Sequence, residues 1–104
     1  MTESTPHAFD VLVLGGGSAG YAAALRASQL GLSVGMVEES KVGGTCLHWG
    51  CIPTKALLHA AEVADHARDG ESIGVNTELH SIDMPKVNAY KQGVIDRLYK
   101  GLQG

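Results

Sequence analysis

A glycine-rich run that directly follows a short apolar segment limits the folds open to this chain. The apolar segment is FDVLVL at residues 9–14, and the run GGGSAG at residues 15–20 follows at once. A short apolar segment that ends at glycines is typical of a buried parallel strand. The Ala- and Leu-rich residues from about 17 to 30 predict a helix that stops at Gly31, and residues 33–37 predict a second strand. This order of elements predicts one βαβ unit of an α/β fold.

Three glycines of this run, Gly15, Gly17 and Gly20, have the spacing of a dinucleotide-binding turn. The first allows a tight turn, the second lets the backbone approach a pyrophosphate, and the third lets the helix pack closely on the strand. Ser18 and Ala19 stand at the helix N-terminus, whose N–H groups and dipole favour an anion. The motif alone is weak evidence, but here it follows a predicted strand and opens a predicted helix. We therefore predict a Rossmann-like dinucleotide cradle.

Glu38 stands at the end of the second predicted strand. Dinucleotide-binding folds place an acidic residue about 20 residues beyond the glycine turn, where it binds the ribose. Its carboxylate can accept hydrogen bonds from ribose hydroxyls and would repel a 2′-phosphate. The plain alternative is a solvated glutamate beside an ordinary glycine turn.

The only two cysteines, Cys46 and Cys51, lie in GGTCLHWGCIPTK at residues 43–55. Residues five apart in a regular helix are separated by roughly 7.5 Å along the axis, whereas a disulfide needs Cα atoms about 4.4–6.8 Å apart. A bridge therefore requires irregular backbone, which Gly50 permits and Pro53 favours because proline fits only the first turn of a helix. Cys51 would then lie near a helix N-terminus, where the dipole lowers the pKa of its thiol, and Cys46 would be more open to substrate.

Three interpretations of this cysteine pair are open from the residues alone. A redox-active disulfide is favoured, because the pair follows a nucleotide cradle and the N-terminus has no secretion signal that would suggest an oxidising compartment. A metal site of Cys46, His48 and Cys51 is disfavoured, since structural zinc needs four ligands. Two inert buried thiols are the third interpretation.

Composition describes one small globular domain. The chain has 104 residues, of which 44% are hydrophobic and 18% charged, and its net charge is −3. That charge gives no reason to expect nucleic acid or an anionic membrane as a partner, and no apolar segment is long enough to span a bilayer. We expect a cytoplasmic protein with a flexible N-terminal arm at residues 1–8 and a partial nucleotide-binding domain at residues 9–104.

Two further helices are predicted after the cysteines. Residues 53 to about 69 have a face of small residues, and residues 85 to about 102 have one apolar side. Asp83 is the expected N-cap of the later helix, and Gly101 a late break in it. Residues 73–76 predict a short extended piece between the two.

These motifs resemble those of the flavin-dependent pyridine nucleotide–disulfide oxidoreductases, from about Phe9 through the final helix. Within that family the cysteine run is most similar to the dihydrolipoyl dehydrogenase branch. The resemblance implies FAD as cofactor, NAD as electron acceptor, the lipoyl group of a 2-oxo acid dehydrogenase complex as partner, and a full-length homodimer. Glutathione, mycothiol and mercuric reductases share the cysteine spacing and stay open as alternatives, as does a truncated nucleotide-binding module without catalysis.

The resemblance also implies roles for individual residues. Cys46 would be the thiol that exchanges with dihydrolipoamide, Cys51 would lie against the flavin and form a charge-transfer pair with it as thiolate, and the charge of Lys55 would stabilise reduced flavin unless it is a solvated helix lysine. The full set expected to contact FAD is Gly15, Gly17, Ser18, Ala19 and Gly20 at the pyrophosphate, Glu38 at the ribose, and Gly43, Gly44, Thr45, Cys46 and Lys55 along the flavin nucleotide.

Family members are several times longer than this chain. Only one glycine fingerprint is present, and nothing matches the family's NAD-binding unit, dimerisation domain or catalytic His-Glu pair. Trp49 departs from the smaller or basic residue usual between the cysteines, and His48 is expected to be structural or exposed. The chain is interpreted as an N-terminal fragment that lacks dehydrogenase activity alone and binds FAD weakly or not at all.

Overall fold

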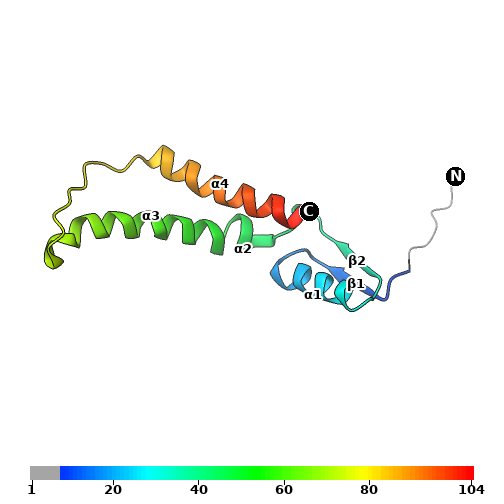
Figure 1. Cartoon of the computed structure of the whole chain (residues 1–104). Helices are drawn as coiled ribbons and strands as arrows, with labels where there is room; N and C mark the ends of the chain where they lie inside the picture. Colours follow the sequence, from blue (N-terminus) through cyan, green and yellow to red (C-terminus); the bar gives the residue numbers. More distant parts are fainter. Residues whose placement is uncertain (1–7) are drawn as a thin grey trace. The chain divides into compact units, whose positions relative to one another are not determined.

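The computed structural model describes residues 8–104, so the predicted N-terminal arm lies outside the described residues except for Ala8. The chain divides into two compact units, a first unit of Met1–Gly44 and a second unit of Thr45–Gly104 (Figure 1). No helix in the described part is long and apolar enough to cross a membrane. The extent of a partial FAD-binding domain over residues 9–104 stays a prediction.

The first unit is a single βαβ unit, as predicted. Strand β1 (Val11–Leu14) is followed by helix α1 (Ser18–Gln29) and strand β2 (Val34–Val37). The two strands pair in parallel, with Val11 opposite Val34 and Leu14 opposite Val37. Helix α1 ends just before Gly31, whose φ of +85° is in the left-handed region that favours glycine. This is an incomplete Rossmann-like sheet with one crossover helix.

Asp10 and Ser33 form two reciprocal hydrogen bonds just before the start of the two strands. The Asp10 N–H donates to Ser33 Oγ at 2.8 Å, and the Ser33 N–H donates to Asp10 Oδ2 at 2.8 Å. The hydrogen bonds from the Ser33 backbone and side chain lower the pKa of the Asp10 carboxyl. The ring of Phe9 covers Gly35, where an added Cβ would come within 2.7 Å of it. These contacts support the register of the two strands at their N-terminal ends.

The sheet of the first unit is thinly covered. Its half-buried positions on β1 are Val11 and Val13, and an added Cβ on Gly20 of α1 would lie 3.4 Å from Val13. The side chains that alternate with them along β1 are exposed, Leu12 by 65% and Leu14 by 89%. Parallel sheets are normally covered on both faces. One face of this sheet therefore leaves apolar surface in water.

The second unit is a helical hairpin. It contains α2 (Gly44–His48, beginning at the last residue of the first unit), α3 (Cys51–Asp69), the 3-10 turn η1 (Gly70–Ile73) and α4 (Met84–Gln103). Helix α4 returns along α3 and packs against it (Figure 1). The buried apolar residues are Leu47, Ala56, Ala64 and Ile95. Two alanines among them keep the facing surface of α3 small, which allows close helix packing.

The N-terminus of α4 follows the predicted pattern. The Asp83 carboxylate accepts the Lys86 N–H at 3.1 Å, so Asp83 is the N-cap, and Pro85 stands in the first turn, where its missing N–H leaves no hydrogen bond unmade.

Two predictions in this unit are wrong. Residues 73–76 form no strand, because η1 continues the chain after α3 and Gly74 then turns it at φ +88°. Helix α4 also runs through Gly101 to Gln103. A helical glycine costs only about 1 kcal/mol relative to alanine, which is too little to end a helix that neighbouring contacts support.

Candidate functional site

The glycine turn between β1 and α1 is shaped by backbone contacts that exclude side chains. Gly15 has φ +99°, which an L side chain rarely adopts. A Cβ on Gly20 would fall on the Gly15 carbonyl oxygen, so the helix can approach the turn only with glycine there. Gly17 is the N-cap of α1, and nothing lies within 4 Å of a Cβ built on it. The position that a side chain at Gly17 would occupy is therefore free of protein atoms.

The N-terminus of α1 has no side-chain cap among the described residues. Ser18 and Ala19 are the first residues of the helix, and both are exposed. The first N–H groups of a helix have no partner within the helix, and they bear the positive end of its dipole. This terminus has the chemistry of an anion site.

Glu38 lies against the same turn. Its Oε2 accepts the Gly16 N–H at 2.6 Å, and its Oε1 accepts the Ser40 N–H at 3.3 Å. Each oxygen of a carboxylate has a second lone pair, so the side chain can accept further hydrogen bonds from hydroxyl groups. The Gly16 contact fixes the carboxylate at the end of β2, beside the glycine turn.

A second glycine segment joins this turn from farther along the chain. The Gly43 N–H donates to the Gly16 carbonyl at 2.7 Å, and both residues are buried. Gly43 and Gly44 have φ of +112° and +64°, and a Cβ on Gly44 would lie 2.8 Å from the Gly17 Cα. The first unit thus brings the two predicted glycine segments together with Glu38.

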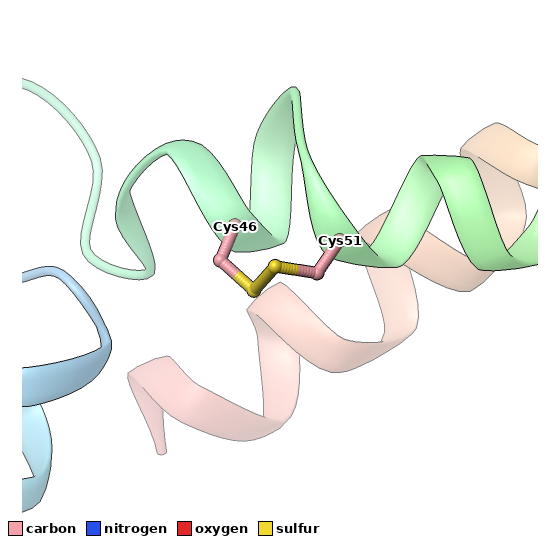
Figure 2. Close-up of a disulfide and its surroundings, with 2 residues drawn as sticks. All are labelled: Cys46 and Cys51. Carbon is pink, nitrogen blue, oxygen red and sulfur yellow. A yellow bond between two sulfur atoms is a disulfide. The ribbon is translucent and has the colours of Figure 1, made fainter.

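The second unit holds the cysteine pair as a disulfide. Cys46 lies in α2, Cys51 is the first residue of α3, and the bridge spans the break between the two helices (Figure 2). Their Cα atoms are 4.6 Å apart, which a regular helix cannot provide. The break is at Gly50, with φ −124° and ψ −109°, where a Cβ would lie 3.0 Å from the Thr45 carbonyl oxygen. The predicted irregular backbone is confirmed.

Pro53 sits in the first turn of α3, as predicted, and is buried. Its missing N–H removes no hydrogen bond, because the first four N–H groups of a helix lack partners in the helix. The regular pattern begins with the Thr54 N–H, which donates to the Gly50 carbonyl at 3.0 Å. The start of α3 is therefore compatible with the bridge and with proline at once.

The two bridged residues are unequally exposed. As whole residues, Cys51 at the start of α3 is exposed and Cys46 within α2 is half-buried, the reverse of the order expected for their openness. Which of the two sulfurs the substrate attacks stays a prediction. Lys55 is exposed and lies one turn beyond Cys51, so both occupy the same side of α3. Both cysteines are bridged and neither is free. Among residues 8–104 no three His, Cys, Asp or Glu side chains are grouped to hold a metal ion.

One residue near the disulfide has no signal in the sequence. The ring of Tyr99, on α4, lies 4.9 Å from the ring of His48. Tyr99 is far from the cysteine run in the chain, and only the packing of α4 brings it there. Trp49, next to His48, is 69% exposed.

Comparison with known proteins places these features in a family. The family model for pyridine nucleotide-disulphide oxidoreductases matches residues 9–103. The chain is 53% identical over 94 residues to a dihydrolipoyl dehydrogenase of Bacillus subtilis, covering 90% of this chain and 20% of that protein. It is 47% identical over 96 residues to one of Thermus scotoductus, covering 92% of this chain and 21% of that protein.

A third relative, dihydrolipoyl dehydrogenase 2 of Haloarcula marismortui, is 48% identical over 94 residues, covering 90% of this chain and 20% of that protein. The chain thus spans about one fifth of the length of these relatives. The family match includes both glycine segments, Glu38 and the bridged cysteines. The chain belongs to the pyridine nucleotide-disulphide oxidoreductase family.

Proposed function

We propose that this chain is the part of a dihydrolipoyl dehydrogenase-like flavoprotein that binds FAD and accepts electrons from a dithiol substrate. The observation that carries the proposal is the Cys46–Cys51 bridge at the start of α3, in a chain whose first unit presents an open helix N-terminus at a glycine turn. The partner would be the lipoyl group of a 2-oxo acid dehydrogenase complex. Under the same proposal, the full-length protein would be a homodimer in the cytoplasm.

The first unit fits a dinucleotide. The open approach at Gly17 and the uncapped start of α1 suit a pyrophosphate, which backbone N–H groups there would bind. Glu38 is held by the Gly16 N–H with lone pairs left for ribose hydroxyls. We therefore assign FAD binding to Gly15, Gly17, Ser18, Ala19, Gly20 and Glu38, with Gly43, Gly44, Thr45, Cys46 and Lys55 toward the flavin.

The cysteines would exchange thiols with the substrate. A substrate thiolate attacks the Cys46 sulfur, the bond to Cys51 breaks, and Cys51 leaves as a thiolate that the start of α3 stabilises. The second substrate thiol then gives its proton to solvent and, as a thiolate, attacks the substrate sulfur that is bonded to Cys46. That bond breaks, Cys46 leaves as a thiolate, and the substrate departs as a disulfide. The chain now holds the two electrons as two reduced cysteine sulfurs. FAD, when bound, would accept this pair and pass it to NAD.

A chimera tests the proposal. Residues 9–103 of this chain replace the matching segment of the Bacillus subtilis relative, and the purified protein is assayed for NAD-linked oxidation of dihydrolipoamide. We expect the chimera to turn over within about tenfold of the Bacillus subtilis protein, and its Cys51→Ser variant to be inactive. On two-electron reduction, the unsubstituted chimera should show a long-wavelength absorbance band. A chimera that binds FAD and reduces glutathione disulfide instead would overturn the substrate assignment.

The 104-residue chain is the matched control. We expect it alone to show no dihydrolipoamide oxidation and weak or no FAD binding, because one βαβ unit supplies only part of a dinucleotide site. Robust turnover by the chain alone would contradict this expectation. A colourless protein whose cysteines never cycle, in both the chain and the chimera, would favour a non-catalytic module.

A further inference from the structure

The end of α2 carries an aromatic contact that the proposed electron transfer does not use. His48 lies in sequence between the two bridged cysteines, in the segment of residues 46–51 that we call the cysteine turn. Its ring meets that of Tyr99 edge-on, with centroids 4.9 Å apart at an interplanar angle of 75°. Tyr99 is half-buried and lies one turn beyond Ile95, which is 4% exposed. The two lie on one face of α4. The contact therefore joins the cysteine turn to the core of the second unit.

Helix α2 needs such support. It has five residues, and a helix of this length is unstable by itself. Burial of Leu47 holds it from one side, and the Cys46–Cys51 bond holds it to α3. When that bond is reduced, the covalent link is lost, and α2 is held by noncovalent contacts alone, among them the ring contact of His48 with Tyr99.

We propose that Tyr99 is a positioning residue for the Cys46–Cys51 pair, which acts through its ring contact with His48 to keep the turn closed and the two thiols near bonding distance. The inference rests on the proposed function only in taking this disulfide as the redox group. In the reduced chain, the ring of Tyr99 keeps the Cys46 and Cys51 thiols close together. It therefore raises the effective concentration of one thiol at the other. A higher effective concentration favours the disulfide over the dithiol.

Equilibration with dithiothreitol measures this effect directly. The sulfur–sulfur bond of the protein breaks, dithiothreitol supplies two electrons and two protons, and its own sulfurs close into a ring disulfide. The ratio of reduced to oxidised dithiothreitol at half-reduction reports the stability of the protein disulfide. A T-shaped ring pair is strong enough to change such an equilibrium by roughly threefold to tenfold.

The test compares three variants of the full chain: Tyr99→Leu, Tyr99→Phe, and Tyr90→Leu as the matched control. Tyr90 is also on α4 but contacts the ring of His59, at 6.4 Å, rather than the cysteine turn. We expect Tyr99→Leu to be half-reduced at a roughly threefold to tenfold lower ratio of reduced to oxidised dithiothreitol; tenfold corresponds to about 30 mV. Tyr99→Phe, which keeps the ring, and Tyr90→Leu should stay within about twofold of the parent.

Helix content by circular dichroism accompanies each titration. His48→Leu is measured alongside and carries the test if Tyr99→Leu loses helix: it should shift the midpoint in the same direction and at least as far, because it removes the ring contact with Tyr99 and also that with Trp49, whose ring centroid lies 5.5 Å away. Where Tyr99→Leu keeps its helix, the double variant should shift no further than His48→Leu alone, because the Tyr99 contact is already lost in it. Midpoints equal to the parent, an equal shift in Tyr90→Leu, or additive shifts in the double variant would overturn the positioning role. None of these measurements involves FAD or turnover, so they leave the proposed function to its own assay.

Discussion

The two units of this chain reach defined geometry by opposite means. In the first, the decisive contacts are between backbone atoms at positions where a side chain would not fit, as at Gly20 against Gly15 and at Gly44 against Gly17. In the second, side chains and one covalent bond decide, with Ile95 4% exposed in the core and Cys46 bonded to Cys51. Contacts of the first kind fix the path of the backbone at the glycine turn, whereas contacts of the second kind fix the positions of two sulfur atoms.

The difference also concerns stability. Leu14 in the first unit is 89% exposed, and its two-stranded sheet has one open face, whereas the four buried apolar residues of the described chain all lie in the second unit. Two paired strands alone are marginally stable in water. We therefore expect the first unit to tolerate substitutions poorly and the second to tolerate them well.

Gly20→Val should have the largest effect, and it should act on the first unit alone. The added side chain would meet the Gly15 carbonyl oxygen, and we expect a loss of about 3 kcal/mol or more in the stability of the first unit, since overpacking alone costs 1–3 kcal/mol. Hydrogen exchange of the β1 amides measures it. The control is Gly93→Ala, in open space on α4, which should stabilise that helix by about 0.5–1 kcal/mol. Equal loss of protection in α3 would show that the units unfold as one.

Reduction of the disulfide should have the next largest effect, and only on the second unit. In the chain-entropy model, a loop this short contributes about 2 kcal/mol. Urea unfolding followed by circular dichroism, with and without dithiothreitol, measures the change. Cys46→Ser, which has no bridge, should behave as the reduced chain does under both conditions. A further loss in Cys46→Ser on adding dithiothreitol would contradict the assignment of the effect to this bond.

Removing the N-cap of α4 should have a smaller effect. Asp83→Ala deletes the carboxylate that accepts the Lys86 N–H, and we expect a loss of about 1 kcal/mol. Asp83→Asn keeps an acceptor and should lose a few tenths of a kcal/mol at most. Thermal melts of the second unit's helical signal distinguish the two. If both substitutions destabilise equally, the negative charge rather than the hydrogen bond is responsible.

The smallest expected effect is a pH dependence confined to the first unit. The hydrogen bonds from Ser33 lower the pKa of Asp10 in the folded chain, so its stabilising effect is fully present above the unfolded pKa and is lost as the pH falls through the folded pKa. Protection of the β1 amides should therefore weaken below about pH 4. Asp10→Asn should remove that part of the pH dependence. The helices of the second unit serve as the internal control.

Much of both units could be predicted from local sequence. The βαβ unit follows from an apolar run, glycines at GxGxxG spacing and a second apolar run, each of which acts within a few residues. The irregular backbone at Gly50 follows from the geometry of a disulfide between residues five apart. The N-cap at Asp83 is likewise a local hydrogen bond. Such features depend on neighbours in the chain and need no knowledge of the packing.

The features that escaped prediction depend on packing between distant segments. The bond from the Gly43 N–H to the Gly16 carbonyl and the contact of Tyr99 with His48 join residues that no local pattern connects. Helix α4 passes through Gly101 because the contacts of the helix outweigh the propensity of one residue. The five-residue helix α2 is too short to have a periodic pattern of its own.

The position of the disulfide has a practical consequence for following the chain's redox state. The bridge closes between Cys46 and Cys51, and no lysine or arginine lies between Lys41 and Lys55. Trypsin therefore releases both sulfurs in one peptide, Val42–Lys55, whether they are bonded or not. The two forms of that peptide differ in mass by two hydrogens. A single digest of a cell extract would thus report the oxidised fraction of this protein as an intensity ratio within one peptide.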